Sequence, residues 1–225
     1  MKQLLQKFPD KNVVVVGHSL GGSIACRIVD ILTNVEKNDR IVGCIVIDVV
    51  EGTAIEALPF MNQIIADRPK HFDSLQSAIK WGYTSCTLRK IESAKVSIPP
   101  QLVEMDRNGQ KVYGWKVKLQ DTEKHWMSWF KGLSHIFLNI HIPKIILTAE
   151  KERLDKELTI AQMQGKFKVV VIHNVGHSVQ EDDYRSTARE LFNLLKDFRI
   201  PMTLQERAEK ELVGIANFHP NLAKY

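Results

Sequence analysis

Residues 13–32 read VVVVGHSLGGSIACRIVDIL, and this stretch decides how the rest of the chain is interpreted. Val13–Val16 is a short run of β-branched residues, which is typical of a strand buried on both faces in a parallel sheet. Ser23–Leu32 has the apolar spacing of a helix. Between them, the glycine-framed residues 17–21 predict a tight strand-to-helix turn with Ser19 at its apex.

The residues at this turn match G-x-S-x-G, the nucleophile elbow of α/β-hydrolases. We expect that side chains at Gly17 and Gly21 would clash with the neighbouring backbone. Ser19 would then be held in a strained conformation that exposes its hydroxyl. Free N–H groups at the start of the following helix stabilise an oxyanion, and the Leu20 N–H is the predicted donor. The motif therefore predicts a serine nucleophile.

Other apolar runs predict the remaining core elements. They give strands at Ile41–Val50, Ile142–Thr148 and Lys168–Ile172, a helix at Tyr184–Phe198, and a short opening helix that ends at Phe8. Alternation of strands and helices predicts a parallel sheet with right-handed crossovers. The expected fold class is therefore α/β with a mostly parallel sheet.

About ninety residues without a strong strand pattern separate the second and third predicted strands, and a stretch this long usually has a function. All four tryptophans of the chain lie there. We expect an inserted helical cap at about 53–141, with MDRNGQK (residues 105–111) as a turn or short flexible loop. The whole chain, 1–225, is interpreted as one domain with a polar C-terminal tail at about 199–225.

Composition limits the class of protein. Hydrophobic residues make up 44% of the 225 residues and charged residues 25%, as in ordinary soluble globular domains. No apolar run reaches the roughly 18 residues of a membrane span. The net charge of +5 comes from scattered basic residues, so we expect neither nucleic-acid nor membrane binding.

Three cysteines without metal spacing predict reduced thiols, with Cys26 and Cys44 buried. Without a signal-peptide pattern at the start, we expect an intracellular protein, cytoplasmic with nuclear residence left open.

A serine nucleophile needs a base to accept its proton, and this fold supplies a histidine after the last strand. The sequence KVVVIHNVGHSVQED, residues 168–182, offers His173 and His177. His173 falls at the end of the predicted strand, whereas His177 lies in the loop that follows. The position in the loop favours His177 as the base.

An acid must orient that imidazole and stabilise its charged form. Asp48 follows an otherwise apolar strand, at the sheet edge where open α/β folds bind ligands. Glu150, Glu152 and Asp155 compete with it, because they follow the next core strand, where the acid is more usual. Position alone favours Asp48 only narrowly.

Several longer blocks resemble one family. IDVVEGTAIEAL (residues 47–58) and LTIAQMQGKF (residues 158–167) are far more specific than the serine motif. Together with GHSLGGSIA, RPKHFDSL, IESAKVSIP, TEKHWMSWFKGLSHIFL and VGHSVQED, they look like the protein phosphatase methylesterase family, in the family's order. The resemblance covers most of the chain from Val13 to Phe198.

The resemblance implies an α/β-hydrolase that removes the methyl ester from the C-terminal leucine of the protein phosphatase 2A catalytic subunit. It implies Ser19 as nucleophile, His177 as base and Asp48 as acid, and so resolves the choice of acid. The implied partners are that catalytic subunit and its methylated tail, which the cap helps to dock. No cofactor or metal is implied. Gln164 is a weak candidate neighbour of the site.

The chain departs from the hydrolase pattern before the elbow. Only a dozen residues precede Val13, and no His-Gly-Gly motif is present to supply a second oxyanion donor. We therefore expect an incomplete fold that lacks its N-terminal strands, with the elbow strand unpaired on one side. Two alternatives stay open: a truncated, non-catalytic phosphatase-binding module, and a serine hydrolase that acts on another ester.

Overall fold

The computed structural model describes residues 1–150 and 154–197. Met1–Glu190 form one compact unit. The described residues that follow it, 191–197, are the end of helix α10 (Tyr184–Asp197). The predicted polar tail at about 199–225 lies outside the described residues.

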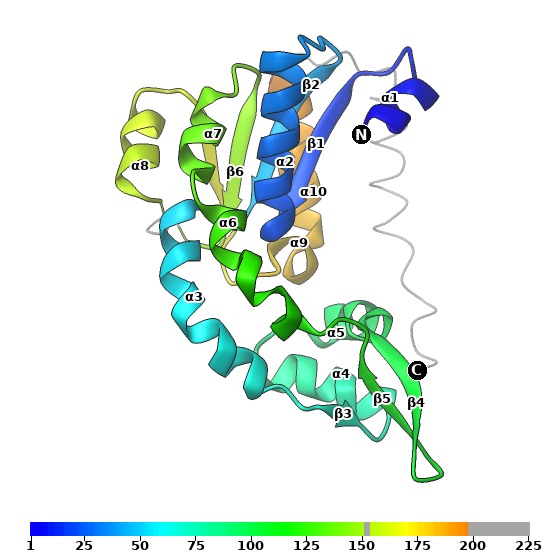
Figure 1. Cartoon of the computed structure of the whole chain (residues 1–225). Helices are drawn as coiled ribbons and strands as arrows, with labels where there is room; N and C mark the ends of the chain where they lie inside the picture. The colour runs from blue at the N-terminus through cyan, green and yellow to red at the C-terminus, as the bar shows by residue number, and fades with distance from the viewer. Residues whose placement is uncertain (151–153, 198–225) are drawn as a thin grey trace. The chain divides into compact units, whose positions relative to one another are not determined.

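The central sheet has four parallel strands (Figure 1). They are β1 (Val13–His18), β2 (Ile41–Ile47), β6 (Lys144–Thr148) and β7 (Lys168–Val171), in the order β1-β2-β6-β7. The predicted parallel α/β sheet is confirmed. The second strand ends earlier than expected, because Asp48 has a φ of 49° and leaves the extended conformation.

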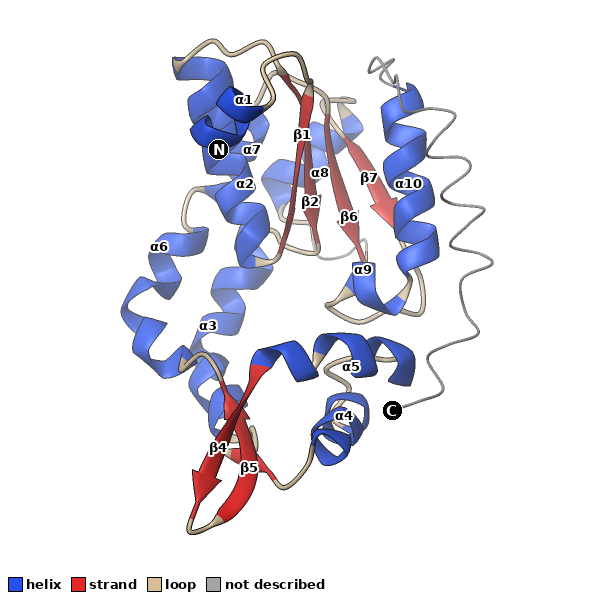
Figure 2. Ribbon diagram, turned by 90° about the vertical axis from the view of Figure 1, so that its right-hand side faces the viewer, coloured by secondary structure: helices blue, strands red, loops and turns tan. Residues whose placement is uncertain are grey.

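Helices cover one face of this sheet and enclose the main core (Figure 2). They are α1 (Lys2–Lys7), α2 (Leu20–Asp30), α7 (Leu133–Asn139) and α8 (Lys156–Met163). Helix α2 begins directly after Ser19 and continues as a π-helical turn, Ile31–Val35. Cys26 and Cys44 are fully buried in this core, as predicted.

Strand β1 lies at the edge of the sheet. It pairs with β2 along its whole length and has no second neighbour among the described strands, as expected for this chain. Val16, near its end, is 46% exposed. The strand that carries the elbow is therefore supported by the sheet on one side.

Most of the segment between β2 and β6, called the cap below (residues 51–130), contains helices and a small sheet. Its helices are α3 (Glu51–Ala66), α4 (Leu75–Thr84), α5 (Ile91–Ser97) and α6 (Trp126–Phe130), with 3-10 turns at Pro99–Gln101 and Leu119–His125. Its antiparallel strands are β3 (His71–Phe72), β4 (Leu102–Arg107) and β5 (Gln110–Trp115), in the order β3-β5-β4.

The small sheet was not predicted. Residues 105–111, expected as a turn or short flexible loop, do contain a turn, Asn108-Gly109, but they form the end of a regular β-hairpin and not a flexible loop. Both turn residues have positive φ, the conformation that Asn-Gly hairpin turns require. The flanking strands mix charged and apolar residues, and most of their residues are exposed, so they lack the apolar runs by which the core strands were recognised.

The cap has its own core. Its buried residues are Phe72, Ala78, Leu88, Ala94, Ile98 and Leu102. The rings of Phe72, Trp81 and Trp115 meet at centroid distances of 5.5–5.8 Å beside them. Figures 1 and 2 both show α4, α5 and the small sheet beyond the C-terminal ends of the parallel strands.

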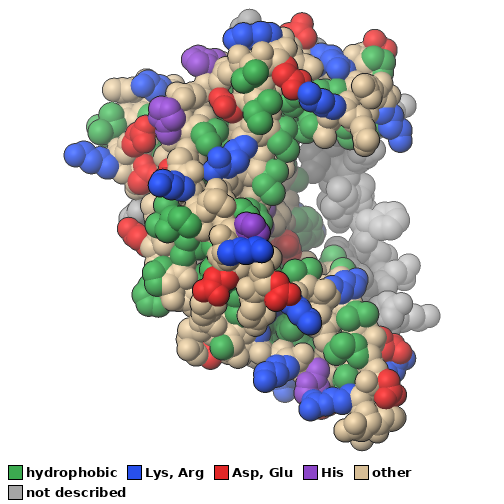
Figure 3. Space-filling model, in the orientation of Figure 1, with side chains coloured by type: hydrophobic (Ala, Val, Ile, Leu, Met, Phe, Trp, Pro, Cys, Tyr) green, Lys and Arg blue, Asp and Glu red, His purple; other side chains and the backbone are tan. Residues whose placement is uncertain are grey.

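The surface carries charges of both signs. Figure 3 shows basic and acidic side chains interspersed over one face, with no continuous basic band there. Within the described ranges, no helix has both the length and the apolar character needed to cross a membrane.

Candidate active site

Ser19 sits between β1 and α2 in a conformation that non-glycine residues rarely adopt. Its φ is 53° and its ψ is −124°. Its N–H donates to the Ile47 carbonyl on β2 at 2.9 Å, and its carbonyl accepts from the Gly22 N–H at 2.8 Å. These bonds fix the turn on both sides, so the strain that was expected at Ser19 is present.

The glycines of the turn have different roles from those predicted. A Cβ atom at Gly17 would lie 2.0 Å from the Gly21 carbonyl oxygen, so Gly17 cannot carry a side chain. The prediction for Gly21 is wrong, because a Cβ there would meet nothing within 4 Å. The constraint falls instead on Gly22, where a Cβ would lie 2.7 Å from Val49 and 3.0 Å from Val46. Helix α2 packs this closely on β2.

Asp48 follows the carboxyl end of β2, just as Ser19 follows the carboxyl end of β1, and the Asp48 side chain is fully buried. Its Oδ2 accepts a hydrogen bond from Nδ1 of His177 at 2.9 Å. Its Oδ1 accepts from the Thr148 hydroxyl and from the Ala149 N–H, each at 3.0 Å. A buried carboxylate needs such donors to stay ionised. Both oxygens of Asp48 are therefore held in place.

His177 lies in the loop after β7, and its side chain is 52% exposed. The bond from Nδ1 to Asp48 leaves Nε2 as the ring nitrogen available to a substrate or a serine. In the part of the chain that the structure describes, the Ser19 hydroxyl makes no hydrogen bond to this ring. Such bonds are often long without substrate. The structure thus brings Asp48 to His177 by direct contact, whereas no described hydrogen bond joins the Ser19 hydroxyl to His177.

His18, which precedes the serine, contacts the same loop. Its Nε2–H donates to the backbone carbonyl of His177 at 2.8 Å, and the two rings lie 4.8 Å apart. Burial lowers the pKa of His18 from its ordinary value. A neutral ring with its proton on Nε2 matches this bond, so His18 holds the His177 backbone.

Asp182 joins the same loop to the cap. This fully buried side chain follows His177 on α9 (Val179–Asp182). It accepts from the Gly176 N–H through one oxygen and from the Arg89 N–H through the other, both at 2.8 Å. The Ser93 hydroxyl donates to the Glu181 carbonyl at 2.5 Å. The His177 loop is therefore anchored to cap residues on its far side.

The competing acids have other surroundings. Asp155 caps α8 by accepting from the Leu158 N–H at 2.9 Å, and it accepts from the Ser134 hydroxyl at 2.5 Å. The main chain of Glu150 bonds to the Thr148 hydroxyl at 2.9 Å. Glu152 lies outside the described residues.

Two further candidates lie on the surface. His173 is exposed just after β7, and no hydrogen bond joins it to Asp48 within the described residues. Gln164 is exposed at the end of α8 and has no described contact with Ser19, Asp48 or His177. The carboxylate contact therefore distinguishes His177 from His173, whereas the roles of these residues stay predictions.

The oxyanion donor predicted at Leu20 is the first residue of α2, where no preceding helical turn can accept its N–H. A second donor is not identified. Among the described residues, no cluster of three or more histidine, cysteine or acidic side chains could hold a metal ion.

Sequence reasoning missed three supporting residues: Thr148, His18 and Asp182. Thr148 ends a strand that neighbours β2, which places its hydroxyl beside any residue that follows β2. A polar residue at the end of an apolar strand was therefore a usable signal. His18 and Asp182 act through the His177 loop, whose path the sequence does not specify.

Curated proteins with similar sequences share one name. The chain is 42% identical to the "Probable protein phosphatase methylesterase 1" of Caenorhabditis elegans, over 81% of this chain and 48% of that protein. It is 37% identical to the "Protein phosphatase methylesterase 1" of Bos taurus, over 76% of this chain and 54% of that protein. The resemblance stated from the sequence is confirmed. The chain spans about half the length of the curated relatives it matches.

Solved structures and a family profile agree on the fold. An E-2-(acetamidomethylene)succinate hydrolase superposes with a TM-score of 0.66 at 14% identity, covering 87% of this chain and 70% of that one. A Mycobacterium tuberculosis esterase superposes with a TM-score of 0.60 at 19% identity, covering 86% and 66%. The profile described as "Alpha/beta hydrolase family" matches residues 2–190. With its parallel sheet and its strained serine between β1 and α2, the chain belongs to the alpha/beta hydrolase family.

Proposed function

We propose that this chain is a serine carboxylesterase of the protein phosphatase methylesterase type. Its substrate is the methyl ester on the C-terminal leucine of the protein phosphatase 2A catalytic subunit, and that subunit is its partner. The names of the relatives at about 40% identity support this substrate. We also propose an intracellular location, in the cytoplasm or the nucleus.

Acylation begins with proton transfer from the Ser19 hydroxyl to Nε2 of His177. The serine oxygen attacks the ester carbonyl, and the resulting oxyanion accepts a hydrogen bond from the Leu20 N–H. The C–O bond to the methoxy group then breaks, and His177 returns the proton so that methanol leaves. Ser19 is left esterified to the leucine carboxyl carbon.

Deacylation repeats the route with water. His177 takes a proton from the water, the hydroxide attacks the acyl carbon, and the proton returns to the Ser19 oxygen as the bond breaks. Asp48 keeps Nδ1 of His177 protonated and stabilises the imidazolium that forms in each step. No step requires a metal ion or a cofactor.

One observation carries this proposal: the 2.9 Å contact between His177 and the buried Asp48, at the sheet edge where Ser19 is strained. The two residues are 129 positions apart in sequence, so only the fold brings them together. The Asp48 carboxylate is fully buried, which distinguishes this contact from an ordinary ion pair on the surface. Burial of the acid beside an exposed ring fits a base whose free nitrogen faces the substrate.

A second candidate is a phosphatase-binding module without catalysis. Two observations favour it: the Ser19 hydroxyl has no described bond to His177, and Leu20 is the single oxyanion donor identified. Removing one oxyanion donor costs about 10²–10³ in rate in other enzymes. Such a module would bind the phosphatase and leave its ester intact.

Demethylation of the methylated phosphatase tests these candidates directly. The chain, Ser19→Ala and His173→Gln are each incubated with methylated phosphatase, and loss of the methyl ester is followed by mass spectrometry. We expect demethylation by the chain and by His173→Gln, and none by Ser19→Ala. Rapid hydrolysis of unrelated esters with the phosphatase methyl groups intact would point to another ester substrate. Phosphatase binding that is equal in Ser19→Ala, without any demethylation, would point to the binding module.

A further inference from the structure

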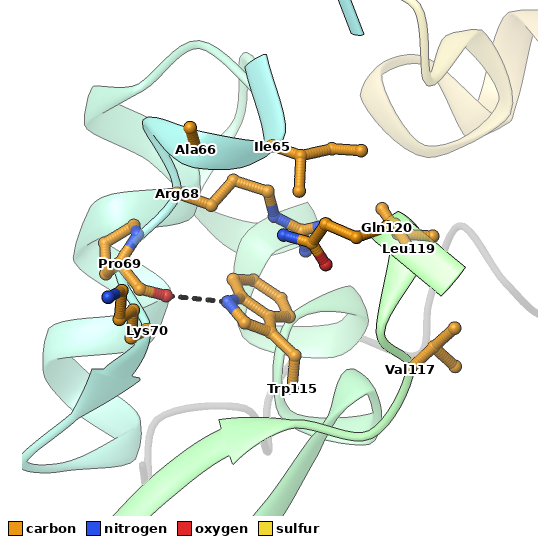
Figure 4. Close-up of a pocket in the computed structure, with 9 residues that line it drawn as sticks. All are labelled: Ile65, Ala66, Arg68, Pro69, Lys70, Trp115, Val117, Leu119 and Gln120. Carbon is orange, nitrogen blue, oxygen red and sulfur yellow. Dashed lines mark hydrogen bonds between the residues drawn. The ribbon is translucent and has the colours of Figure 1, made fainter. Parts of the chain in front are cut away.

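A cavity of about 110 Å³ lies in the cap, apart from the Ser19 site. Figure 4 shows the residues that line it, which come from the end of α3, the turn after it, the last residue of β5, the segment that follows β5 and the 3-10 turn Leu119–His125. Ser19, Asp48 and His177 are not among them. The proposed esterase chemistry does not use this cavity.

Arg68 and Trp115 form the rigid part of the wall. The guanidinium carbon of Arg68 lies 3.7 Å from the centroid of the Trp115 ring. Nε1–H of Trp115 donates to the Pro69 carbonyl at 2.8 Å (Figure 4), and the ring packs against Phe72 and Trp81. The indole is thus fixed on two sides. Stacking covers one face of the guanidinium and leaves its N–H groups directed along its edges.

The charge of Arg68 is not balanced within this cavity. Across the described ranges, Arg68 has no ion pair or hydrogen bond, and burial lowers its pKa from the ordinary value. Lys70 also lines the cavity, whereas no aspartate or glutamate does. The neighbouring Asp67 accepts from the Gln63 amide at 2.7 Å. A half-buried cation without a counter-charge is costly, and an incoming anion would offset that cost.

The size of the cavity restricts the anion. A water needs about 10–15 Å³ of such cavity volume, so the space holds several waters or one side chain. Pockets for drug-sized ligands are about 300–1,000 Å³. Ile65 and Leu119 supply apolar walls, and Gln120 supplies an amide. These walls suit the methylenes and the carboxylate of an acidic side chain.

Basic side chains lie in the lining of the cavity and near it in sequence. Lys70 lines the cavity and is exposed. Lys116 and Lys118, which flank the lining residue Val117 in the sequence, are exposed as well but do not line the cavity. The Lys116 ammonium donates to the Pro100 carbonyl at 2.6 Å, which holds it on the cap surface. Arg68 and Lys70 in one cavity, with further exposed lysines on the same cap, would attract a peptide with several carboxylates better than a single small anion.

We propose that this cavity binds the carboxylate of a glutamate or aspartate in an acidic segment of a partner protein. The Arg68 guanidinium takes the carboxylate through paired N–H···O bonds, while Trp115 fixes the plane of the guanidinium. The site is separate from the esterase centre and does not depend on turnover there.

The site can be tested by NMR, through the indole N–H signals of the ¹⁵N-labelled full chain. The signal of Trp115 is the one that disappears in Trp115→Phe. The probes are a blocked glutamate-rich hexapeptide, its glutamine counterpart and inorganic phosphate. We expect the glutamate peptide to shift the Trp115 signal saturably at millimolar concentrations. The glutamine peptide and the Arg68→Gln chain should bind at least tenfold more weakly. Lys80→Gln removes an exposed cap charge outside the cavity and should bind as the unmodified chain does.

A second variant, Arg68→Lys, separates loss of binding from loss of folding, in case Arg68→Gln does not fold. It keeps the positive charge but lacks the paired N–H donors of the guanidinium. We expect it to fold and to bind the peptide several-fold more weakly than the unmodified chain. Three results would overturn the proposal: no saturable shift with the glutamate peptide, equal weakening by Lys80→Gln, or saturation by inorganic phosphate without peptide binding.

Discussion

Asp48, buried at the carboxyl end of the sheet, and Arg68, half-buried in the cap, differ in the partners that the fold gives them. Asp48 accepts three hydrogen bonds through two oxygens, from His177, Thr148 and Ala149. Arg68 rests on Trp115 without an ion pair among the described residues. Because both of its carboxylate oxygens accept hydrogen bonds, Asp48 has a fixed orientation, and proton transfer through His177 requires such an orientation. A group without a counter-charge can still accept a ligand.

The difference has a topological cause. Parallel strands end at the same sheet edge, so β2 and β6 place Asp48 beside Thr148 and Ala149 without long loops. The cap instead packs short elements around aromatic rings, and its polar groups lie at the borders of that cluster. Four changes test this contrast, starting with the largest expected effect.

Asp48→Asn should abolish most esterase activity if the Asp48 bond sets the tautomer of His177. The amide can present an N–H to the ring, which favours the wrong tautomer, and the comparable change in serine proteases costs about 10⁴-fold in kcat. Hydrolysis of a methyl-ester peptide measures the loss, and thermal unfolding confirms that the variant folds. A loss below about tenfold would mean that Asp48 does not serve the base.

Lys144→Met should destabilise the sheet region strongly. Lys144 is 5% exposed on β6, and its ammonium donates to the carbonyls of Phe137, Leu138 and Ile140 at 2.6–2.8 Å. Burial lowers its pKa to about 8, so it is mostly charged at neutral pH. Methionine leaves these carbonyls without their donor, at a cost of about 3 kcal/mol. Urea unfolding would show this, and an unchanged midpoint would contradict it.

Arg68→Met should change stability by less than about 1 kcal/mol. The loss of the contact with Trp115 is offset by removing a half-buried charge that has no counter-charge. The same urea experiment measures it against Lys144→Met. A cost near that of Lys144→Met would show that Arg68 is a structural group, and the contrast between the two regions would fail.

His18→Gln should produce the smallest effect, a change in the pH dependence of thermal stability. Burial lowers the pKa of His18 in the folded state, so the unfolded chain binds this proton first as the pH falls. The contribution of His18 is therefore complete above pH ~6.5 and is lost at lower pH. Between about pH 7 and 5, the unmodified chain should lose Tm more steeply than His18→Gln. Parallel curves would contradict this.

The sequence was sufficient for the parallel sheet, because its buried strands are continuous apolar runs, as in Val13–Val16. It was insufficient for β4 and β5, whose residues are mostly exposed and whose pairing depends on the Asn108-Gly109 turn. Helix boundaries shifted for a similar reason. Helix α2 begins at Leu20, because the Ser19 turn and not the apolar pattern sets its start.

Position along the strands suggested His177 over His173 and favoured Asp48 only narrowly over Glu150, Glu152 and Asp155. The family resemblance resolved the choice of acid, and the structure shows the contact between Asp48 and His177. The residues that support this contact were not predicted.

The glycine argument succeeded at Gly17 and failed at Gly21, because the close approach of α2 to β2 falls at Gly22. A one-residue difference of this kind depends on helix packing, which the local sequence does not encode.

Labelling with a fluorophosphonate tests the proton relay most directly, because the probe reacts only with an activated serine. Adduct formation is followed by mass spectrometry of the chain, of His177→Gln and of the matched control His173→Gln. The account predicts an adduct on Ser19, formed at similar rates in the chain and in His173→Gln and at least about 10³-fold more slowly in His177→Gln. An adduct that is absent from Ser19, or that forms equally fast in His177→Gln, would contradict it.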